Sequence, residues 1–130
     1  MDKKELLKFI IKNNSSVILT NLLEGKDINN SYILPSLINK EELVGYYKDN
    51  KYCSPKWLTE INNDEKNIIL VIDKIDSITF DEQDKFVELI KYKKVSTFKL
   101  KDECRIILTA KKIEQVSSTI KDLVIYIGGN

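Results

Sequence analysis

Ile68-Ile-Leu-Val-Ile-Asp73-Lys74-Ile75-Asp76 is the most informative segment of this 130-residue chain. Five consecutive aliphatic residues are followed by a carboxylate. A continuous apolar run of this length suits a strand that is buried on both faces, which is typical of parallel α/β sheets. The polar end of the strand is then expected at the carboxyl edge of the sheet, where such sheets bind their ligands.

Helical and extended segments alternate on both sides of this strand. Apolar residues at helical spacing predict a helix over residues 2–13, which ends at Asn13-Asn14-Ser15-Ser16. Further helical segments are expected from Asn39, from Pro55 and over residues 81–92. Strands are expected at residues 17–20, 32–34, 105–109 and 123–127, with an edge strand at 95–100. This order predicts a single α/β domain over residues 1–130, a three-layer sandwich with a mainly parallel sheet.

Charge and hydropathy narrow the classes of partner. With 21 basic and 20 acidic residues the formal net charge is +1, so no global field attracts nucleic acid or an anionic membrane, and neither partner is expected. No apolar run approaches the ~20 residues needed to cross a bilayer. The N-terminus lacks the uncharged apolar core of a secretion signal. We therefore expect a cytoplasmic protein.

Histidine is absent, and the two cysteines are far apart in the sequence. Cys53 and Cys104 are too few for a zinc site or a redox pair, so no metal site is predicted and both are expected to be reduced and wholly or partly buried. Without histidine the chain also lacks the commonest general base.

Several motifs come in a fixed order along the chain. Leu34-Pro-Ser-Leu37 is followed by Glu42-Leu-Val-Gly-Tyr-Tyr47 and Ser54-Pro-Lys-Trp-Leu58, and then by the strand at 68–76. In this order and spacing almost the whole chain resembles the core of an AAA+ ATPase, most closely the MoxR-like and dynein-related branch. The resemblance implies a P-loop NTPase-like fold.

The phosphate loop departs from that resemblance. A working G-x-x-x-x-G-K-[ST] loop needs glycines, a lysine and a hydroxyl, but here the stretch reads Thr20-Asn-Leu-Leu-Glu-Gly25-Lys26-Asp27. Only four residues then precede the next strand, where the family has a helix of several turns. Either that helix is deleted or the first two strands pair differently. We expect the phosphate-loop helix to be missing and, because the sequence ends at Gly128-Gly-Asn130, the lid domain as well.

The resemblance also locates the catalytic positions, and most are altered. Asp73 matches the magnesium-coordinating aspartate, whereas Lys74 replaces the glutamate that activates water, a role worth ~10²–10⁴ in rate. Thr109 or Lys111 falls where the family senses the terminal phosphate. The sole arginine, Arg105, opens a core strand, so no arginine finger is expected. No catalytic residue is therefore assigned.

The function predicted from these residues is a non-catalytic, AAA+-like protein-interaction or assembly module, a pseudo-ATPase that needs no cofactor. The alternative is a switch that binds ATP and magnesium weakly through Lys26, Asp73 and Lys111 without hydrolysis. A third hypothesis is an unrelated enzyme that uses a carboxylate cluster such as Asp73, Asp76 and Asp81.

The densest group of aromatic residues is the candidate partner surface. It comprises Tyr46, Tyr47, Tyr52 and Trp57. Such residues either pack in the core and loops or form interface hot spots. The expected partner is a protein, either a second copy of this chain or a true AAA+ relative.

Overall fold

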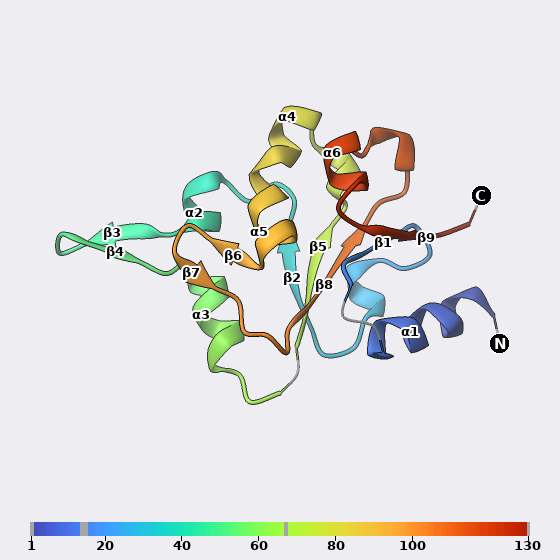
Figure 1. Ribbon diagram of the computed structural model, residues 1–130, viewed down its shortest axis with the longest axis horizontal. Helices are drawn as coiled ribbons and strands as arrows, with labels where there is room; N and C mark the ends of the chain where they lie inside the picture. Colours follow the sequence, from blue (N-terminus) through green and yellow to red (C-terminus); the bar gives the residue numbers. More distant parts are fainter. Residues whose placement is uncertain (1, 14–15, 67, 130) are drawn as a thin grey trace.

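A five-stranded parallel sheet forms the centre of the computed structural model, which describes residues 2–13, 16–66 and 68–129 (Figure 1). The strand order is β2-β5-β8-β1-β9, and every pairing in this sheet is parallel. The strands are β1 (Ile18–Thr20), β2 (Ser31–Pro35), β5 (Ile69–Asp73), β8 (Arg105–Thr109) and β9 (Ile125–Ile127). The mainly parallel sheet predicted from the sequence is therefore confirmed.

The apolar segment that ends at Asp73 forms β5, which lies in the interior of the sheet. Its residues Leu70, Val71 and Ile72 are fully buried, because β2 lies on one side, β8 on the other, and side chains cover both faces. Alternation sends Val71 to one face and its two neighbours to the opposite face. Asp73 ends the strand at the carboxyl edge, as expected.

Helix α1 (Lys3–Asn13) covers the first face of the sheet, which we call the α1 face. Its Leu7 and Ile11 pack against Ile18, Val71 and Ile107 of the sheet. The guanidinium of Arg105 donates to the Ile11 carbonyl and ties the end of α1 to β8. The helix agrees with its prediction; the expected stop at 13–16 falls partly on residues 14 and 15, outside the described residues.

The second face carries the larger core and most of the helices, which completes three layers. These helices are α2 (Lys40–Val44), α3 (Lys56–Asn63), α4 (Phe80–Gln83), α5 (Val87–Tyr92) and α6 (Ser118–Lys121). Asn39 caps α2 as predicted, since its side chain accepts from the Glu42 N–H at 2.7 Å. Short 3₁₀ turns η2 (Ile75–Ser77) and η4 (Ile113–Gln115) follow β5 and β8.

The helix predicted over 81–92 is broken. Between α4 and α5 the chain forms the 3₁₀ turn η3 (Asp84–Phe86). In a 3₁₀ turn residues i and i+3 share one side. Gln83 and Phe86 are both fully buried, and the Gln83 amide bonds to Ile78, Gln115 and Ser117.

Two small antiparallel hairpins lie outside the main sheet. The first joins β3 (Tyr46–Lys48) to β4 (Lys51–Cys53) and extends away from the body of the molecule in Figure 1. This hairpin was not predicted, because its turn residues Asp49 and Asn50, both at positive φ, lack the glycine that usually marks such a turn.

The second hairpin corrects the edge strand expected at 95–100. That segment instead forms β6 (Lys94–Val95) and β7 (Phe98–Lys99), which pair with each other. The left-handed backbone of Ser96, at φ 55°, reverses the chain and ends the extended run. None of the helices in the described part of the chain has the length and apolarity needed to span a bilayer.

Candidate functional site

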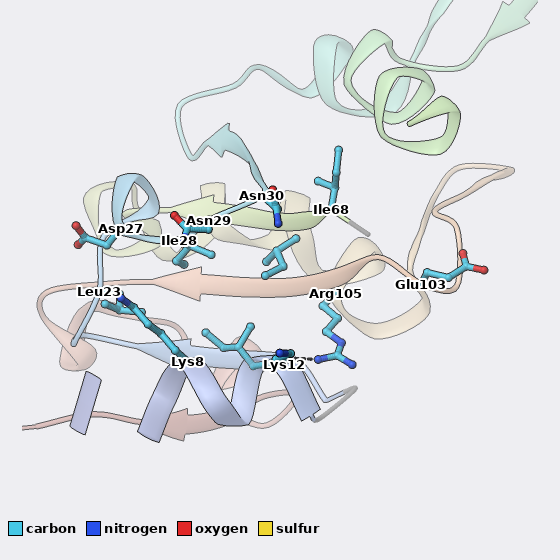
Figure 2. Close-up of a pocket in the computed structure, with 12 residues that line it drawn as sticks. Lys8, Lys12, Leu23, Asp27, Ile28, Asn29, Asn30, Ile68, Glu103 and Arg105 are labelled. Carbon is cyan, nitrogen blue, oxygen red and sulfur yellow. Dashed lines mark hydrogen bonds between the residues drawn. The ribbon is translucent and has the colours of Figure 1, made fainter. Parts of the chain in front are cut away.

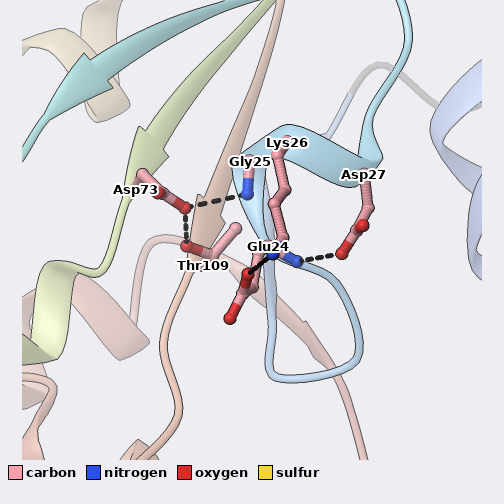
Figure 3. A network of polar contacts seen from close by, with 6 residues as sticks. All are labelled: Glu24, Gly25, Lys26, Asp27, Asp73 and Thr109. Atoms are coloured by element: carbon pink, nitrogen blue, oxygen red, sulfur yellow. Dashed lines mark hydrogen bonds and ion pairs between the residues drawn. The ribbon is translucent and has the colours of Figure 1, made fainter.

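The carboxyl ends of β5 and β8 meet at Asp73 and Thr109 (Figure 3). The Asp73 Oδ1 atom accepts two hydrogen bonds, from the Gly25 backbone N–H at 2.9 Å and from the Thr109 hydroxyl at 2.6 Å. The Thr109 oxygen in turn accepts from the Lys74 N–H at 2.8 Å. The carboxylate oxygen that faces the loop is therefore occupied by the protein's own donors.

Residues 21–30, which we call the β1–β2 link, bring Gly25 to this position. The link contains one 3₁₀ turn, η1 (Gly25–Asp27), in place of a longer helix. It follows the buried Thr20 of β1, whose hydroxyl accepts from the Leu22 N–H at 3.1 Å. The link buries Leu23 and Ile28 on the α1 face. The expectation that the phosphate-loop helix is missing is confirmed, and both strands keep their places in one parallel sheet.

Charged side chains of the link interact with one another. The Lys26 Nζ atom lies 3.2 Å from Glu24 Oε2, and the hydrogen bond and charge of Glu24 raise the pKa of Lys26 above 10.5. The Asp27 carboxylate accepts from the Glu24 N–H at 3.0 Å. In Figure 3 Lys26 lies along the link, toward Glu24.

A hollow of about 250 Å³ lies beside this network at the carboxyl edge. Lys4, Lys74 and Lys111 contribute its basic wall, and Glu24 and Asp27 its acidic wall. Of the residues predicted to bind nucleotide, Lys111 lines this hollow, whereas Asp73 faces Gly25 and Lys26 pairs with Glu24.

The three aspartates of the enzyme hypothesis do not form a metal site. Asp76 accepts the backbone N–H groups of Lys111 and Lys112 at 3.1 and 3.0 Å, and Asp81 lies in α4. Within residues 2–13, 16–66 and 68–129, no three acidic, cysteine or histidine side chains are grouped so that they could hold a metal ion.

A second hollow, of about 520 Å³, lies on the α1 face between α1 and the β1–β2 link (Figure 2). Leu23, Ile28 and Ile69 form part of its apolar floor. Basic Lys8, Lys12 and Arg105 and acidic Asp27 and Glu103 also line it. The short link and α1 thus leave part of this sheet face open.

The sequence and the structure were compared with known proteins. No family model matches the sequence, and no curated protein matches it. Solved structures do: the Thermotoga maritima RuvB Holliday junction branch migration motor superposes with a TM-score of 0.60 at 11% identity, over 98% of this chain and 44% of that one. A point mutant of that motor gives 0.60 at 12% identity, with the same coverage. This chain has the AAA+ P-loop-like α/β fold. It spans less than half the length of these structures.

Of the four aromatic residues predicted to form a partner surface, some are buried or packed and others are exposed. Trp57 is buried in the core and its indole N–H donates to the Leu43 carbonyl at 2.9 Å. Tyr52 donates to the Val44 carbonyl at 2.9 Å and stacks on Phe98 with ring centroids 5.6 Å apart. Tyr46 and Tyr47 are exposed on β3.

A third hollow, of about 830 Å³, lies along β2 and is called the β2 groove below. It is lined by Tyr32, Ile33, Leu34, Pro35, Leu37, Ile38, Asn39, Glu41, Glu42, Tyr46, Pro55, Lys56 and Trp57. Ile33 and Leu37 were not among the residues predicted to form a partner surface. Pro35 was the available signal, because proline within a strand is confined to sheet edges.

Proposed function

We propose that this chain is a non-catalytic AAA+-like module of the MoxR-like and dynein-related type that acts through protein interaction or assembly. The observation that supports the proposal is the pair of hydrogen bonds on Asp73 Oδ1. In a working site the loop N–H groups turn toward phosphate and this carboxylate turns toward magnesium. Here the Gly25 N–H and Asp73 satisfy each other.

The charged groups near this network also argue against nucleotide binding and hydrolysis. Nucleotide binding would have to break the Gly25–Asp73 bond and bring phosphates close to the Glu24 and Asp27 carboxylates. The Lys74 ammonium cannot act as the general base that its position requires in an ATPase. The adjacent hollow of about 250 Å³ is smaller than the ~300–1,000 Å³ of typical ligand pockets.

Isothermal titration of the full chain with ATP and magnesium tests the proposal. We expect no saturable heat at micromolar nucleotide and no release of phosphate above the buffer rate. Micromolar affinity together with turnover would contradict a pseudo-ATPase.

A second candidate function is a weak nucleotide-binding switch without hydrolysis. The hollow at the carboxyl edge favours it, because Lys4, Lys74 and Lys111 together could neutralise phosphate. A saturable rise in melting temperature with ATP would support the switch. Lys111→Ala should then abolish the shift and Lys26→Ala should weaken it, whereas Lys112→Ala, which changes the next residue, should not.

The aromatic motifs are the basis on which we propose the partner and the MoxR-like branch. Residues 42–47 run from α2 into β3 of the exposed β3–β4 hairpin, and residues 54–58 follow β4. Both motifs carry the resemblance to the MoxR-like branch. The proposed partner is a second copy of this chain or a true AAA+ relative in the cytoplasm. Light scattering after size exclusion measures self-association; a concentration-independent monomer would leave the relative as the partner.

A further inference from the structure

Strand β2 is an edge of the main sheet, because in the described part of the chain it pairs with β5 alone. The Ile69 N–H donates to the Asn30 carbonyl at 2.9 Å, which fixes the alternation of the parallel ladder. Asn30, Tyr32 and Leu34 therefore direct their backbone groups toward β5. The N–H and C=O of Ile33 point away from the sheet, toward the open edge.

The β2 groove lies over this edge rather than over one sheet face. Four consecutive β2 residues, Tyr32 to Pro35, line it, although successive side chains of a strand point to opposite faces. A hollow that contacts both sets must include the edge between them. Its other wall comes from α2 and the start of α3.

Large apolar side chains are exposed around the groove. Leu37 is 77% exposed, and Ile33 and Tyr46 are more than 40% exposed. Such residues, gathered beside an edge with unpaired backbone groups, are the usual components of a strand-addition site, in which main-chain hydrogen bonds provide affinity and side-chain pockets provide specificity.

The charged residues of the groove favour a basic occupant. Glu41 and Glu42 lie on the α2 wall, against one ammonium, that of Lys56. Glu42 is engaged with Asn39, since its Oε1 accepts from the Asn39 side chain at 2.9 Å. Glu41 is exposed in the first turn of α2.

We infer that the β2 groove binds an extended, apolar segment of a partner protein that carries a basic residue, and that this segment adds to β2 as a further strand. The inference rests on the proposed interaction function and names its site and the chemistry of the partner. A helical ligand would satisfy its own backbone and leave the Ile33 N–H and C=O without a partner.

Selection from a phage-displayed library of random 12-residue peptides against the immobilised full chain tests the inference. We expect enriched peptides to alternate apolar residues and to contain lysine or arginine. Synthetic copies are then titrated by fluorescence anisotropy. N-methylation of alternate peptide residues should weaken binding about tenfold in one register and little in the other, because only one set of N–H groups faces β2.

Protein variants distinguish what the β2 backbone contributes to peptide binding from what the side chains contribute. Ile33→Pro removes the outward N–H and should weaken binding about tenfold, more than Ile33→Ala, which keeps it. Tyr126→Pro is the matched control: the Ile125 N–H donates to Val17, so the Tyr126 N–H faces the opposite, β9 edge, and binding should be unchanged. Glu41→Lys should weaken basic peptides about two- to fivefold.

Four results would overturn the inference: no enrichment, enrichment of acidic or helix-periodic peptides, equal binding by Ile33→Pro and wild type, or binding that ignores the register of N-methylation. The register experiment uses the unmodified protein, so it decides the matter even where Ile33→Pro does not fold. Failure here leaves interaction through another surface open, whereas ATP turnover would contradict the proposed function whatever the peptides do.

Discussion

Asp73, which the sequence predicted to match a magnesium ligand, accepts hydrogen bonds from two donors of the protein on its loop-facing oxygen. Thr109 connects this network, because its hydroxyl donates to Asp73 and accepts from the Lys74 N–H. Thr109 is 3% exposed, so water does not readily replace the hydroxyl. The residue that falls where a phosphate sensor is expected therefore holds two strand ends together.

Thr109→Val is expected to destabilise the fold by about 1–3 kcal/mol, because it leaves the Lys74 N–H without its acceptor and removes a donor from Asp73. Urea unfolding measures the change. Thr97→Val, at an exposed position in the β6–β7 turn, is the control and should cost less than ~0.5 kcal/mol. Equal effects of the two variants would mean that the network contributes nothing.

Cys104 is buried where the chain enters β8, and burial raises the pKa of its thiol above 9.0. In Cys53→Ser protein, Cys104 should react with iodoacetamide at least about tenfold more slowly than Cys53 does in Cys104→Ala protein.

A raised pKa of Cys104 means that the stability gained from the neutral thiol is complete below pH 9.0 and declines as pH rises through the folded-state pKa. The stability difference between wild type and Cys104→Ala should therefore narrow from pH 8 to pH 10; a constant difference would contradict the assignment.

Among the elements, the β3–β4 hairpin depends on Gly45, the residue that precedes it. Gly45 ends α2 at φ 123°, and a Cβ there would approach the Cys53 carbonyl oxygen to less than 3.0 Å. Both the backbone angle and the space require glycine. The hairpin thus leaves the body of the molecule at a direction that this residue sets.

Gly45→Ala is expected to cost about 1–3 kcal/mol through backbone strain, and the clash with β4 adds to it. Thermal melting followed by circular dichroism measures the loss. Gly129→Ala is the matched control, because a Cβ at that position meets its neighbours at 3.4 Å or more. A Gly45→Ala protein as stable as the control would show that the hairpin can leave α2 along another path.

At the scale of the whole molecule, the two faces of the sheet share the same strands. The α1 face has the smaller core, with Leu7 fully buried, and the second face contains Trp57. Because Val71 and its neighbours in β5 belong to opposite cores, loss of one core should disrupt the other. We expect one cooperative unfolding unit.

Leu7→Ala should destabilise the protein by about 2–5 kcal/mol and lower the midpoints of Trp57 fluorescence and of circular dichroism by equal amounts. The neighbouring Leu6→Ala, at a side chain that is 47% exposed, should change stability by less than ~0.5 kcal/mol. Separate midpoints in Leu7→Ala protein would mean that α1 and its face unfold independently.

Patterns that act over a few residues were readable from the sequence. The run at 68–73 predicted a doubly buried strand, apolar spacing predicted α1, and Asn39 predicted the start of α2. The short spacing after Lys26 correctly indicated a missing helix. These signals are local, because burial on two faces, helical periodicity and capping each depend on adjacent residues.

Tertiary structure alone decided what depends on distant partners. The sequence separates Gly25 from Asp73 by 48 residues, and no local pattern indicates that the loop N–H would bond to that carboxylate. Likewise, Trp57 and Tyr46 belong to one aromatic group in the sequence, but packing buries the first and exposes the second. The open edge of β2 is a consequence of the strand order. That order forms only when segments far apart in the chain pair, so the residues that line the edge could not by themselves predict it.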